Sequence, residues 1–290
     1  MPLLCLRCWN GLEARFGTDA VAAFLERREA VHNLPIAILG GTRAGRDEGL
    51  RYLAAVERGR VVVAAGMRTQ IKYVLADAEE PQAVELLAAD ALAKHPDLPG
   101  WIGPAAQAER FAEVWTREGG GAARLAMRLR VHELVAVRQA ARVPGCLVPP
   151  GPRDLPLLAK WTAGFCQDIG EPLRRDPAET ARHELRAGTT AFWRDTGGRI
   201  VSMASWGGPT PHGIRIRKVY TPPEYRNRGY AEACVAAVSA RLLRRGRRFC
   251  LLYTDLANAT SNALYRRIGY LPVCDASDFR TTRRGEVRAV

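Results

Sequence analysis

The alternation of apolar and polar residues divides the chain into two runs of elements. In the first run, apolar positions at helical spacing predict helices, whereas alternating or short continuous apolar stretches predict strands. The predicted helices are residues 18–31, 79–94 and 104–117. The predicted strands are residues 52–56, 60–65, 71–75, 100–103 and 124–137.

The second run follows residues 143–153, whose prolines and glycines predict a linker. Its predicted helices are residues 154–165, 178–186, 231–242 and 258–267, and its predicted strands are residues 190–194, 199–206, 213–221, 249–254 and 270–273. Interspersed helices and strands predict an α/β (α+β) fold with a mixed sheet. The length suits two domains, predicted at residues 1–143 and 144–290.

The stretch KVYTPPEYRNRGYA, residues 218–231, predicts an anion site. A strand, a glycine-bearing turn and a helix N-terminus follow one another, and the first N–H groups of a helix lack partners while its dipole favours negative charge. Gly229 lets the backbone approach a phosphate, and Arg226 and Arg228 add positive charge. A basic helix start is also common as a plain surface turn, so these residues alone leave both interpretations open.

The stretch FCLLYTDLANATSNALYRRIGYLPV, residues 249–273, favours the anion site over the plain surface turn. It predicts a buried strand, a helix and a further strand. With it, the sequence resembles the GNAT acetyltransferase superfamily over roughly residues 151–290. The coenzyme loop of that family, Arg/Gln-x-x-Gly-x-Gly/Ala, is matched by Arg226, Gly229 and Ala231. Its later Asn and Tyr are matched by Asn258 and Tyr265.

The resemblance implies an N-acetyltransferase that uses acetyl-CoA as its cosubstrate and moves the acetyl group directly to an amine. It implies that the pantetheine arm pairs with the strand at residues 219–221, and that Tyr265 is the general acid toward the departing thiolate. The coenzyme-binding residues implied in this way are Val219, Tyr220, Thr221, Arg226, Asn227, Arg228, Gly229, Tyr230, Ala231, Asn258, Asn262 and Tyr265.

The general base is less well defined by the sequence. Asp255 ends the strand predicted beside the coenzyme, so we name it as the candidate. Other carboxylates, or a chain of water molecules, are alternatives. These carboxylates are Asp168, Glu171 and Glu224.

The first run of elements has an order similar to that of the second, which predicts two GNAT-like domains in tandem. Where its coenzyme loop would lie, residues 74–87 read VLADAEEPQAVELL, with acidic residues and no glycine. Acidic groups would repel a pyrophosphate, so we expect a degenerate N-terminal domain that does not bind the coenzyme. An unrelated α/β domain is the alternative.

The net charge of +13 raises the question of nucleic acid, because a basic protein can bind phosphate backbones. The basic residues are spread along the chain, with one cluster at residues 241–248 that could complement a helix dipole or contact the 3′-phosphate of coenzyme A. We therefore do not expect a nucleic acid partner.

The seven cysteines are odd in number and irregularly spaced, so no disulfide framework is predicted. Cys5 and Cys8 form a CxxC, but no second pair completes a metal site, and no metal is expected. No apolar stretch is long enough to span a bilayer, and the first residues do not read as a signal peptide, so we expect a cytoplasmic protein without a membrane partner.

The sequence therefore predicts an acetyl-CoA-dependent N-acetyltransferase with an amine acceptor, which is a small molecule, an amino acid or a peptide. The alternative from another class is a regulatory module that binds acetyl-CoA without turnover. A homodimer is left open as the assembly state.

Overall fold

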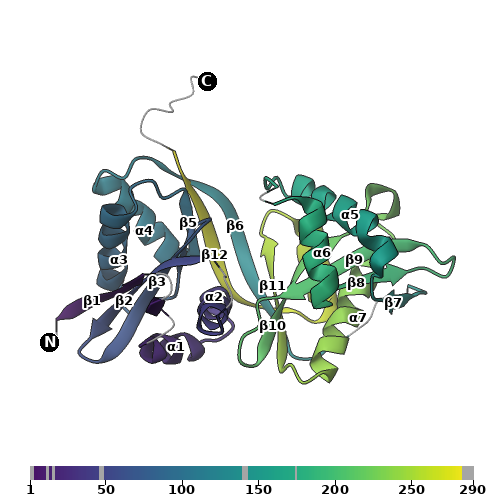
Figure 1. Cartoon of the computed structure of the whole chain (residues 1–290), viewed down its shortest axis with the longest axis horizontal. Coiled ribbons are helices and arrows are strands. Elements are labelled where there is room, and N and C mark those ends of the chain that lie inside the picture. The colour runs from purple at the N-terminus through teal and green to yellow at the C-terminus, as the bar shows by residue number, and fades with distance from the viewer. Residues whose placement is uncertain are drawn as a thin grey trace. The chain divides into compact units, whose positions relative to one another are not determined.

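A computed structural model describes residues 3–10, 13–14, 17–45, 49–138, 143–173 and 175–282. The first half contains β1 (Leu4–Asn10), α1 (Asp19–Glu26), α2 (Asn33–Arg43), β2 (Leu50–Arg58), β3 (Val61–Thr69), β4 (Tyr73–Leu75), α3 (Pro81–Lys94), β5 (Gly100–Pro104), α4 (Ala105–Arg117) and β6 (Ala123–Leu134). The second half contains β7 (Cys146–Val148), α5 (Leu155–Asp168), α6 (Pro177–Ala187), β8 (Thr190–Arg194), β9 (Ile200–Gly207), β10 (Gly213–Tyr220), α7 (Tyr230–Arg244), β11 (Phe249–Asp255), α8 (Ala259–Ile268) and β12 (Leu271–Thr281). The ten elements follow the same order in both halves (Figure 1).

Each half contains the same mixed arrangement of strands. In the first half, β2, β3 and β4 pair antiparallel, and β5 then pairs parallel with β4 after the crossover helix α3. In the second half, β8, β9 and β10 pair antiparallel, and β11 pairs parallel with β10 after α7. A parallel neighbour needs a crossover connection, and a helix supplies it in both cases. The predicted mixed-sheet fold with two similar domains in tandem is therefore confirmed.

The sheet of the first unit is buried on both faces, because successive strand residues point to opposite sides. Tyr52, Ala54 and Val56 of β2 join the core that contains α3 and α4. Leu53 and Ala55, between them, join a separate core with α1 and α2. One pair of helices thus covers each face.

The second unit is layered in the same way. Ala191 and Trp193 of β8 share a core with α7 and α8. Phe192, between them, packs with Leu158 and Trp161 of α5 on the other face. Helix α7 therefore packs on the face of the sheet opposite α5. The loop of residues 221–229, where the anion site was predicted, joins β10 to the N-terminus of α7.

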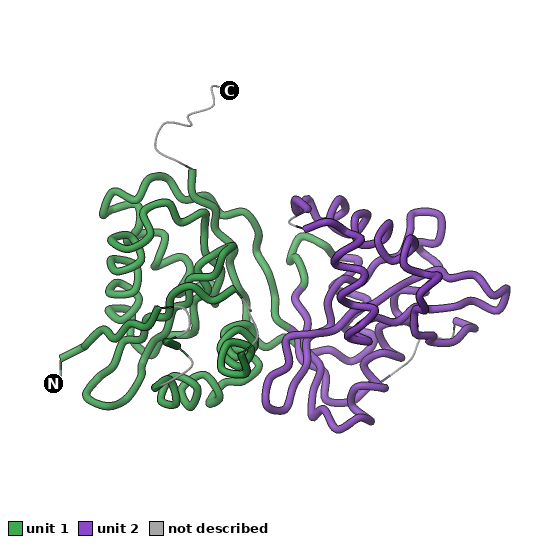
Figure 2. The backbone as a smooth tube through the Cα atoms, viewed as in Figure 1, with its two compact units in different colours: residues 1–131, 254–258, 272–290 green, residues 132–253, 259–271 purple. Residues whose placement is uncertain are grey.

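The last strand of the chain belongs to the sheet of the first unit. Residues 276–280 of β12 pair antiparallel with residues 100–104 of β5, and the strand order places β12 between β5 and β6. Within the described residues, the first compact unit accordingly comprises residues 1–131, 254–258 and 272–290, and the second comprises residues 132–253 and 259–271 (Figure 2). These units divide the chain differently from the domains expected at residues 1–143 and 144–290, which remain a prediction.

Several elements differ from the prediction. The helix expected at residues 18–31 ends at residue 26 as α1, and helix α2 at residues 33–43 was not predicted. Strand β1 was not predicted. Residues 146–148 of the expected linker form β7, which pairs with β8. Strand β12 extends to residue 281, well beyond the residues 270–273 that were expected.

His32 makes the stability of the first unit dependent on pH. Its ring is buried, Nδ1 lies 2.8 Å from the carbonyl oxygen of Leu25, and Nε2 accepts the N–H of Asp77 at 3.1 Å. Because Nε2 is an acceptor, Nδ1 must carry the proton, and this fixes the neutral ring. Burial lowers the pKa of His32 from 6.5 to about 4.

Because the pKa of His32 is depressed in the folded state, its full contribution is present above pH 6.5 and is lost as the pH falls toward 4. We expect the free energy of unfolding to drop by about 2 kcal/mol between pH 8 and pH 5 from this group alone. Urea titrations of His32→Gln should show a shallower pH dependence than the wild type. The matched variant His183→Gln, at an exposed position of α6, should keep the wild-type slope, and equal slopes in all three proteins would contradict the assignment.

Candidate functional site

The connection between β10 and α7 has the backbone form of an anion site. A short 3₁₀ turn at Pro223–Tyr225 leads to Gly229, which adopts the left-handed conformation with φ of 77° at the start of α7. The N–H of Ala233 donates to the carbonyl oxygen of Gly229 at 3.0 Å, which is the first helical bond. The N–H groups of residues 229–232 therefore precede the helical ladder and point out of the helix N-terminus.

Gly229 is required at this position for two reasons. Its φ of 77° lies in the region that side chains rarely adopt. A Cβ atom there would also lie 2.7 Å from Cγ2 of Val143. Any other residue must therefore shift the loop as well as strain it.

The two arginines of the loop differ in their surroundings. The guanidinium of Arg226 donates from Nε to the carbonyl oxygen of Thr221 at 2.9 Å, forms an ion pair with Asp168 at the end of α5, and lies 6.0 Å from the ring centroid of Tyr220. The Arg226 side chain therefore links the loop to the end of β10 and to α5. Arg228 is exposed and has no carboxylate partner in the described part of the chain, so it is the arginine available to a bound anion.

Strands β10 and β11 pair over a short distance only. The parallel register joins residues 213–215 to residues 249–251, and ends there in the described chain. On the other side of β10, the register with β9 shifts between Arg217 and Tyr220, so the strand contains a bulge. Parallel strands that part in this way leave backbone groups for another extended chain.

The residues proposed for the pantetheine arm begin at this bulge. The carbonyl oxygen of Tyr220 accepts a hydrogen bond from Oγ of Ser202 at 3.2 Å, and that of Thr221 accepts one from Nε of Arg226 at 2.9 Å. Val219 lies within the register shift itself.

Tyr265 lies on α8, and only 9 % of its surface is exposed. Its ring packs edge-on against Tyr270, with the centroids 5.9 Å apart. Burial, with a smaller contribution from Cys234, raises the pKa of Tyr265 above 10. The phenol is therefore protonated at neutral pH and is a hydrogen-bond donor.

Asn258, Asn262 and Tyr265 share a face of the helix, since they are spaced by four and three residues. Asn258 directly precedes Ala259, the first residue of α8, which is the position of a helix cap. The predicted base, Asp255, ends β11. Its Oδ1 accepts the N–H of Ala257 at 2.9 Å, so the carboxylate helps to form the turn into the helix.

The alternatives for the base are also placed. Asp168 is paired with Arg226, and Glu224 is exposed in the 3₁₀ turn. Sequence reasoning did not single out Glu184 of α6, which is 2 % exposed and forms an ion pair with Lys218 of the bulge. No glycine or motif marks that position, so nothing in the local sequence could have identified it.

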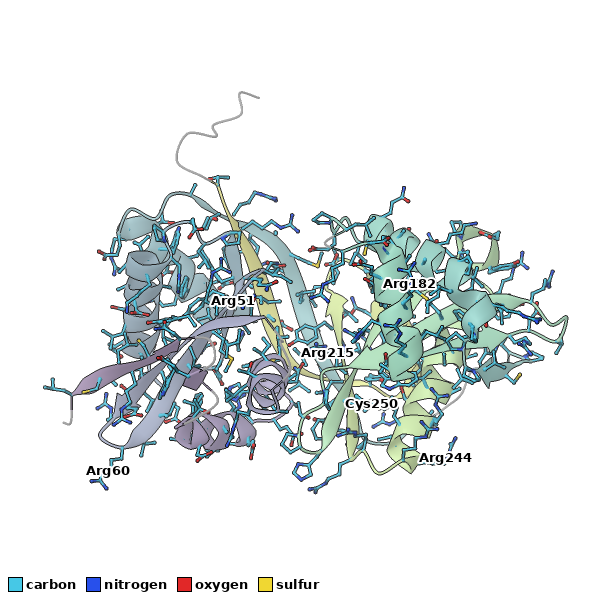
Figure 3. The ribbon with its side chains drawn as sticks, in the orientation of Figure 1. Arg51, Arg60, Arg182, Arg215, Arg244 and Cys250 are labelled. Carbon is cyan, nitrogen blue, oxygen red and sulfur yellow. The ribbon has the colours of Figure 1, made fainter. Side chains whose placement is uncertain are left out.

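Two cysteines of the second unit, Cys234 and Cys250, are unsuited to act as nucleophiles. Cys234 of α7 and Cys250 of β11 are buried, and burial raises the pKa of each thiol to about 12 (Figure 3 labels Cys250). Both are therefore thiols rather than thiolates at neutral pH.

In the first unit, Cys5 and Cys8 lie on strand β1, where residues three apart point to opposite faces. In the described residues no group of three or more Cys, His, Asp and Glu side chains could hold a metal ion.

The arginine cluster at residues 241–248 lies at the C-terminal end of α7 and just beyond it, whereas the anion loop was predicted at the N-terminal end. The helix has 15 residues, so its ends are about 22 Å apart. Arg244, labelled in Figure 3, is its last residue. Arg241 stacks over Trp206 at 4.7 Å and Arg247 donates to two backbone carbonyls, so these two side chains have partners within the protein. A contact between the cluster and the 3′-phosphate stays a prediction.

The acidic loop of the first unit lies at the corresponding place, between β4 and α3. Its carboxylates are engaged by arginines: Asp77 by Arg28, Glu79 by Arg27 at 3.0 Å, and Glu80 by Arg58. Pro81, the first residue of α3, has no N–H to offer to an anion. These contacts support the view that this loop does not bind a pyrophosphate.

Comparisons with known proteins agree with this geometry. Residues 196–277 match the family model described as FR47-like protein. A search of curated proteins found no match.

No helix in the described part of the chain has the length and apolar character needed to cross a membrane.

Solved structures extend the similarity to the whole chain. A GCN5-related N-acetyltransferase from Sphaerobacter thermophilus is 16 % identical with a TM-score of 0.63, and the match covers 97 % of this chain and 96 % of that one. A Drosophila protein is 14 % identical with a TM-score of 0.64, covering 96 % and 98 %. A tandem GNAT protein from the clavulanic acid biosynthesis pathway is 14 % identical with a TM-score of 0.56, covering 97 % and 98 %.

The chain therefore has the fold of the GNAT acetyltransferases. Its predicted resemblance to that superfamily is confirmed, with a FR47-like segment in the second half and a tandem arrangement of the whole.

Proposed function

We propose that the chain is an acetyl-CoA-dependent N-acetyltransferase whose coenzyme site is formed by β10, the loop up to Gly229 and the first turn of α7. The observation that carries this proposal is the left-handed Gly229 at the N-terminus of α7, joined by a short loop to a bulged strand whose parallel pairing has ended. Backbone N–H groups and Arg228 would hold the pyrophosphate, since both favour oxyanions.

In the proposed reaction, the neutral amine attacks the thioester carbonyl carbon, and the C–N bond forms as the C–S bond breaks. The electron pair leaves with sulfur, and the Tyr265 hydroxyl donates its proton, or a hydrogen bond, to the thiolate. The raised pKa of Tyr265 keeps the phenol protonated, which favours donation of a hydrogen bond to the developing thiolate over full transfer of the proton. Asp255 remains our proposed base for the amine, as a residue at the carboxyl end of β11.

Calorimetric titration of acetyl-CoA tests the proposal, with ADP and NADH as controls. We expect micromolar binding of acetyl-CoA and much weaker binding of NADH. A panel of small amines, amino acids and peptides should then be screened for acetylation by mass spectrometry. Thiol reagents are unsuitable for detection, because Cys5, Cys8 and Cys146 are exposed and would react.

Two results would change the assignment. Acetyl-CoA binding without acetylation of any amine would favour the regulatory module that binds the coenzyme without turnover. The absence of acetyl-CoA binding would refute the coenzyme site itself.

A further inference from the structure

The bulge of β10 contains a strained lysine. Lys218 has a φ of 46°, in the left-handed region that is costly for residues other than glycine. The register with β9 passes from Arg217 opposite Ser205 to Tyr220 opposite Met203. Two residues of β10, Lys218 and Val219, therefore stand opposite the single residue Ala204, which defines a bulge.

A buried ion pair holds this lysine. Nζ of Lys218 lies 2.6 Å from Oε2 of Glu184 on α6, and the two side chains are 12 % and 2 % exposed. The hydroxyl oxygens of Thr190 and Ser205 lie 3.3 Å and 3.5 Å from the same carboxylate oxygen. Its other oxygen lies 3.6 Å from Nη2 of Arg217.

The contacts of Glu184 come from neighbouring strands in register. Thr190 of β8 is opposite Ser205 of β9, which is opposite Arg217 of β10. The two hydroxyl groups are also 2.7 Å apart. The carboxylate therefore ties three adjacent strands and α6 together at the residue before the bulge.

Stability alone does not account for this arrangement. A buried ion pair contributes little net stability compared with apolar residues of similar volume, because both charges lose their hydration. Nζ of Lys218 is shielded from solvent, so the lysine does not itself contact a substrate. What the pair does fix is the conformation of the backbone just before Val219.

We propose, on the basis of the acetyltransferase function above, that Glu184 is a positioning residue for the coenzyme. It holds Lys218 in the left-handed conformation and so aims the backbone of residues 219–221 at the pantetheine amides. Glu184 acts through Lys218 and touches neither the coenzyme nor the acceptor.

The test compares two double variants that both remove the buried charges. In Glu184→Gln with Lys218→Gly, glycine adopts the left-handed conformation without the ion pair. In Glu184→Gln with Lys218→Met, a side chain remains but nothing holds it there. We expect the methionine variant to weaken acetyl-CoA binding about tenfold or more, and the glycine variant to stay within about threefold of the wild type.

Hydrogen exchange of the amides of residues 213–221 gives a second readout that does not depend on the coenzyme. We expect faster exchange in the methionine variant than in the glycine variant. Equal acetyl-CoA affinity and equal exchange in the two variants would overturn the proposal. If wild-type protein does not bind acetyl-CoA, the function proposed above fails and the coenzyme role of Glu184 fails with it, whereas the exchange rates still decide whether Glu184 fixes the bulge.

A milder variant covers the case in which the methionine variant does not fold. Thr190→Val with Ser205→Ala removes the two hydroxyl groups that lie against Glu184 and leaves both charges in place. We expect faster exchange at residues 213–221 and weaker acetyl-CoA binding at an unchanged melting temperature of the first unit. Unchanged exchange and affinity would count against the proposal.

Discussion

Replacing Tyr265 by phenylalanine is expected to lower kcat by about 10²-fold or more, and to leave the Kd for acetyl-CoA within about threefold of the wild type. Phenylalanine keeps the ring that packs edge-on against Tyr270, so the fold of α8 is preserved. Only the hydroxyl is lost. Since that group is proposed to act on sulfur as the C–S bond breaks, its removal affects the transition state rather than the bound coenzyme.

Tyr270→Phe is the matched control for this variant. Tyr270 is also buried and neighbours Tyr265, but its hydroxyl is hydrogen-bonded to Oγ of Ser239 at 2.8 Å. We expect Tyr270→Phe to lower stability by about 1 kcal/mol and to leave kcat nearly unchanged. A wild-type kcat in Tyr265→Phe, or an equal loss in both variants, would remove Tyr265 from the chemistry.

The pH profile gives an independent check on the acid. Burial raises the pKa of Tyr265 above 10, so the phenol is protonated below that pH. No alkaline loss of kcat from this group is therefore expected up to about pH 10. A kcat that falls between pH 8 and pH 9 and loses that fall in Tyr265→Phe would show that the environment of the phenol has been misjudged.

The second large effect is expected at Gly229. Gly229→Ala should weaken acetyl-CoA binding about a hundredfold, because the methyl group collides with Val143 and shifts the N–H groups that would hold the pyrophosphate. Two charge-assisted hydrogen bonds lost at about 1.5 kcal/mol or more each are enough for that factor. Calorimetric titration measures it.

Gly246→Ala is the control, since Gly246 follows the same helix at its other end. Its φ of 93° is left-handed as well, but no atom lies within 4 Å of the added Cβ. Both variants therefore carry backbone strain, and only Gly229→Ala disturbs the anion loop. Equal acetyl-CoA affinity in the two proteins would mean that the loop is an ordinary surface turn.

Much of the fold could be predicted from the sequence because hydrophobic periodicity reports which faces are buried. The alternation in β6 and the apolar run of β11 are examples. Strand β7 was not predicted, since three residues among prolines give no period. Strand β12 was underestimated because its polar residues conceal the alternation, and because its partner β5 lies far away in the sequence.

The candidate site was predictable where its chemistry is local. Gly229 could be proposed because a turn into a helix needs a left-handed residue, whereas Tyr265 was proposed from the resemblance to the GNAT superfamily. Tertiary partners were not predictable. Asp168 forms an ion pair with Arg226, which is 58 residues away in the sequence. Glu184 of α6 forms an ion pair with Lys218 of β10. Such pairs form only when the helices pack on the sheet.

Because β12, the last strand of the chain, belongs to the sheet of the first unit, that sheet is completed late in synthesis on the ribosome. Strand β5 leaves the exit tunnel about 170 residues before its neighbour β12 does, so it must wait with an unpaired edge while the rest of the chain is translated. Closing so long a loop is slow and entropically costly. The nascent first unit is thus the part of this chain that we expect chaperones to occupy, until residue 281 has emerged and the sheet is completed.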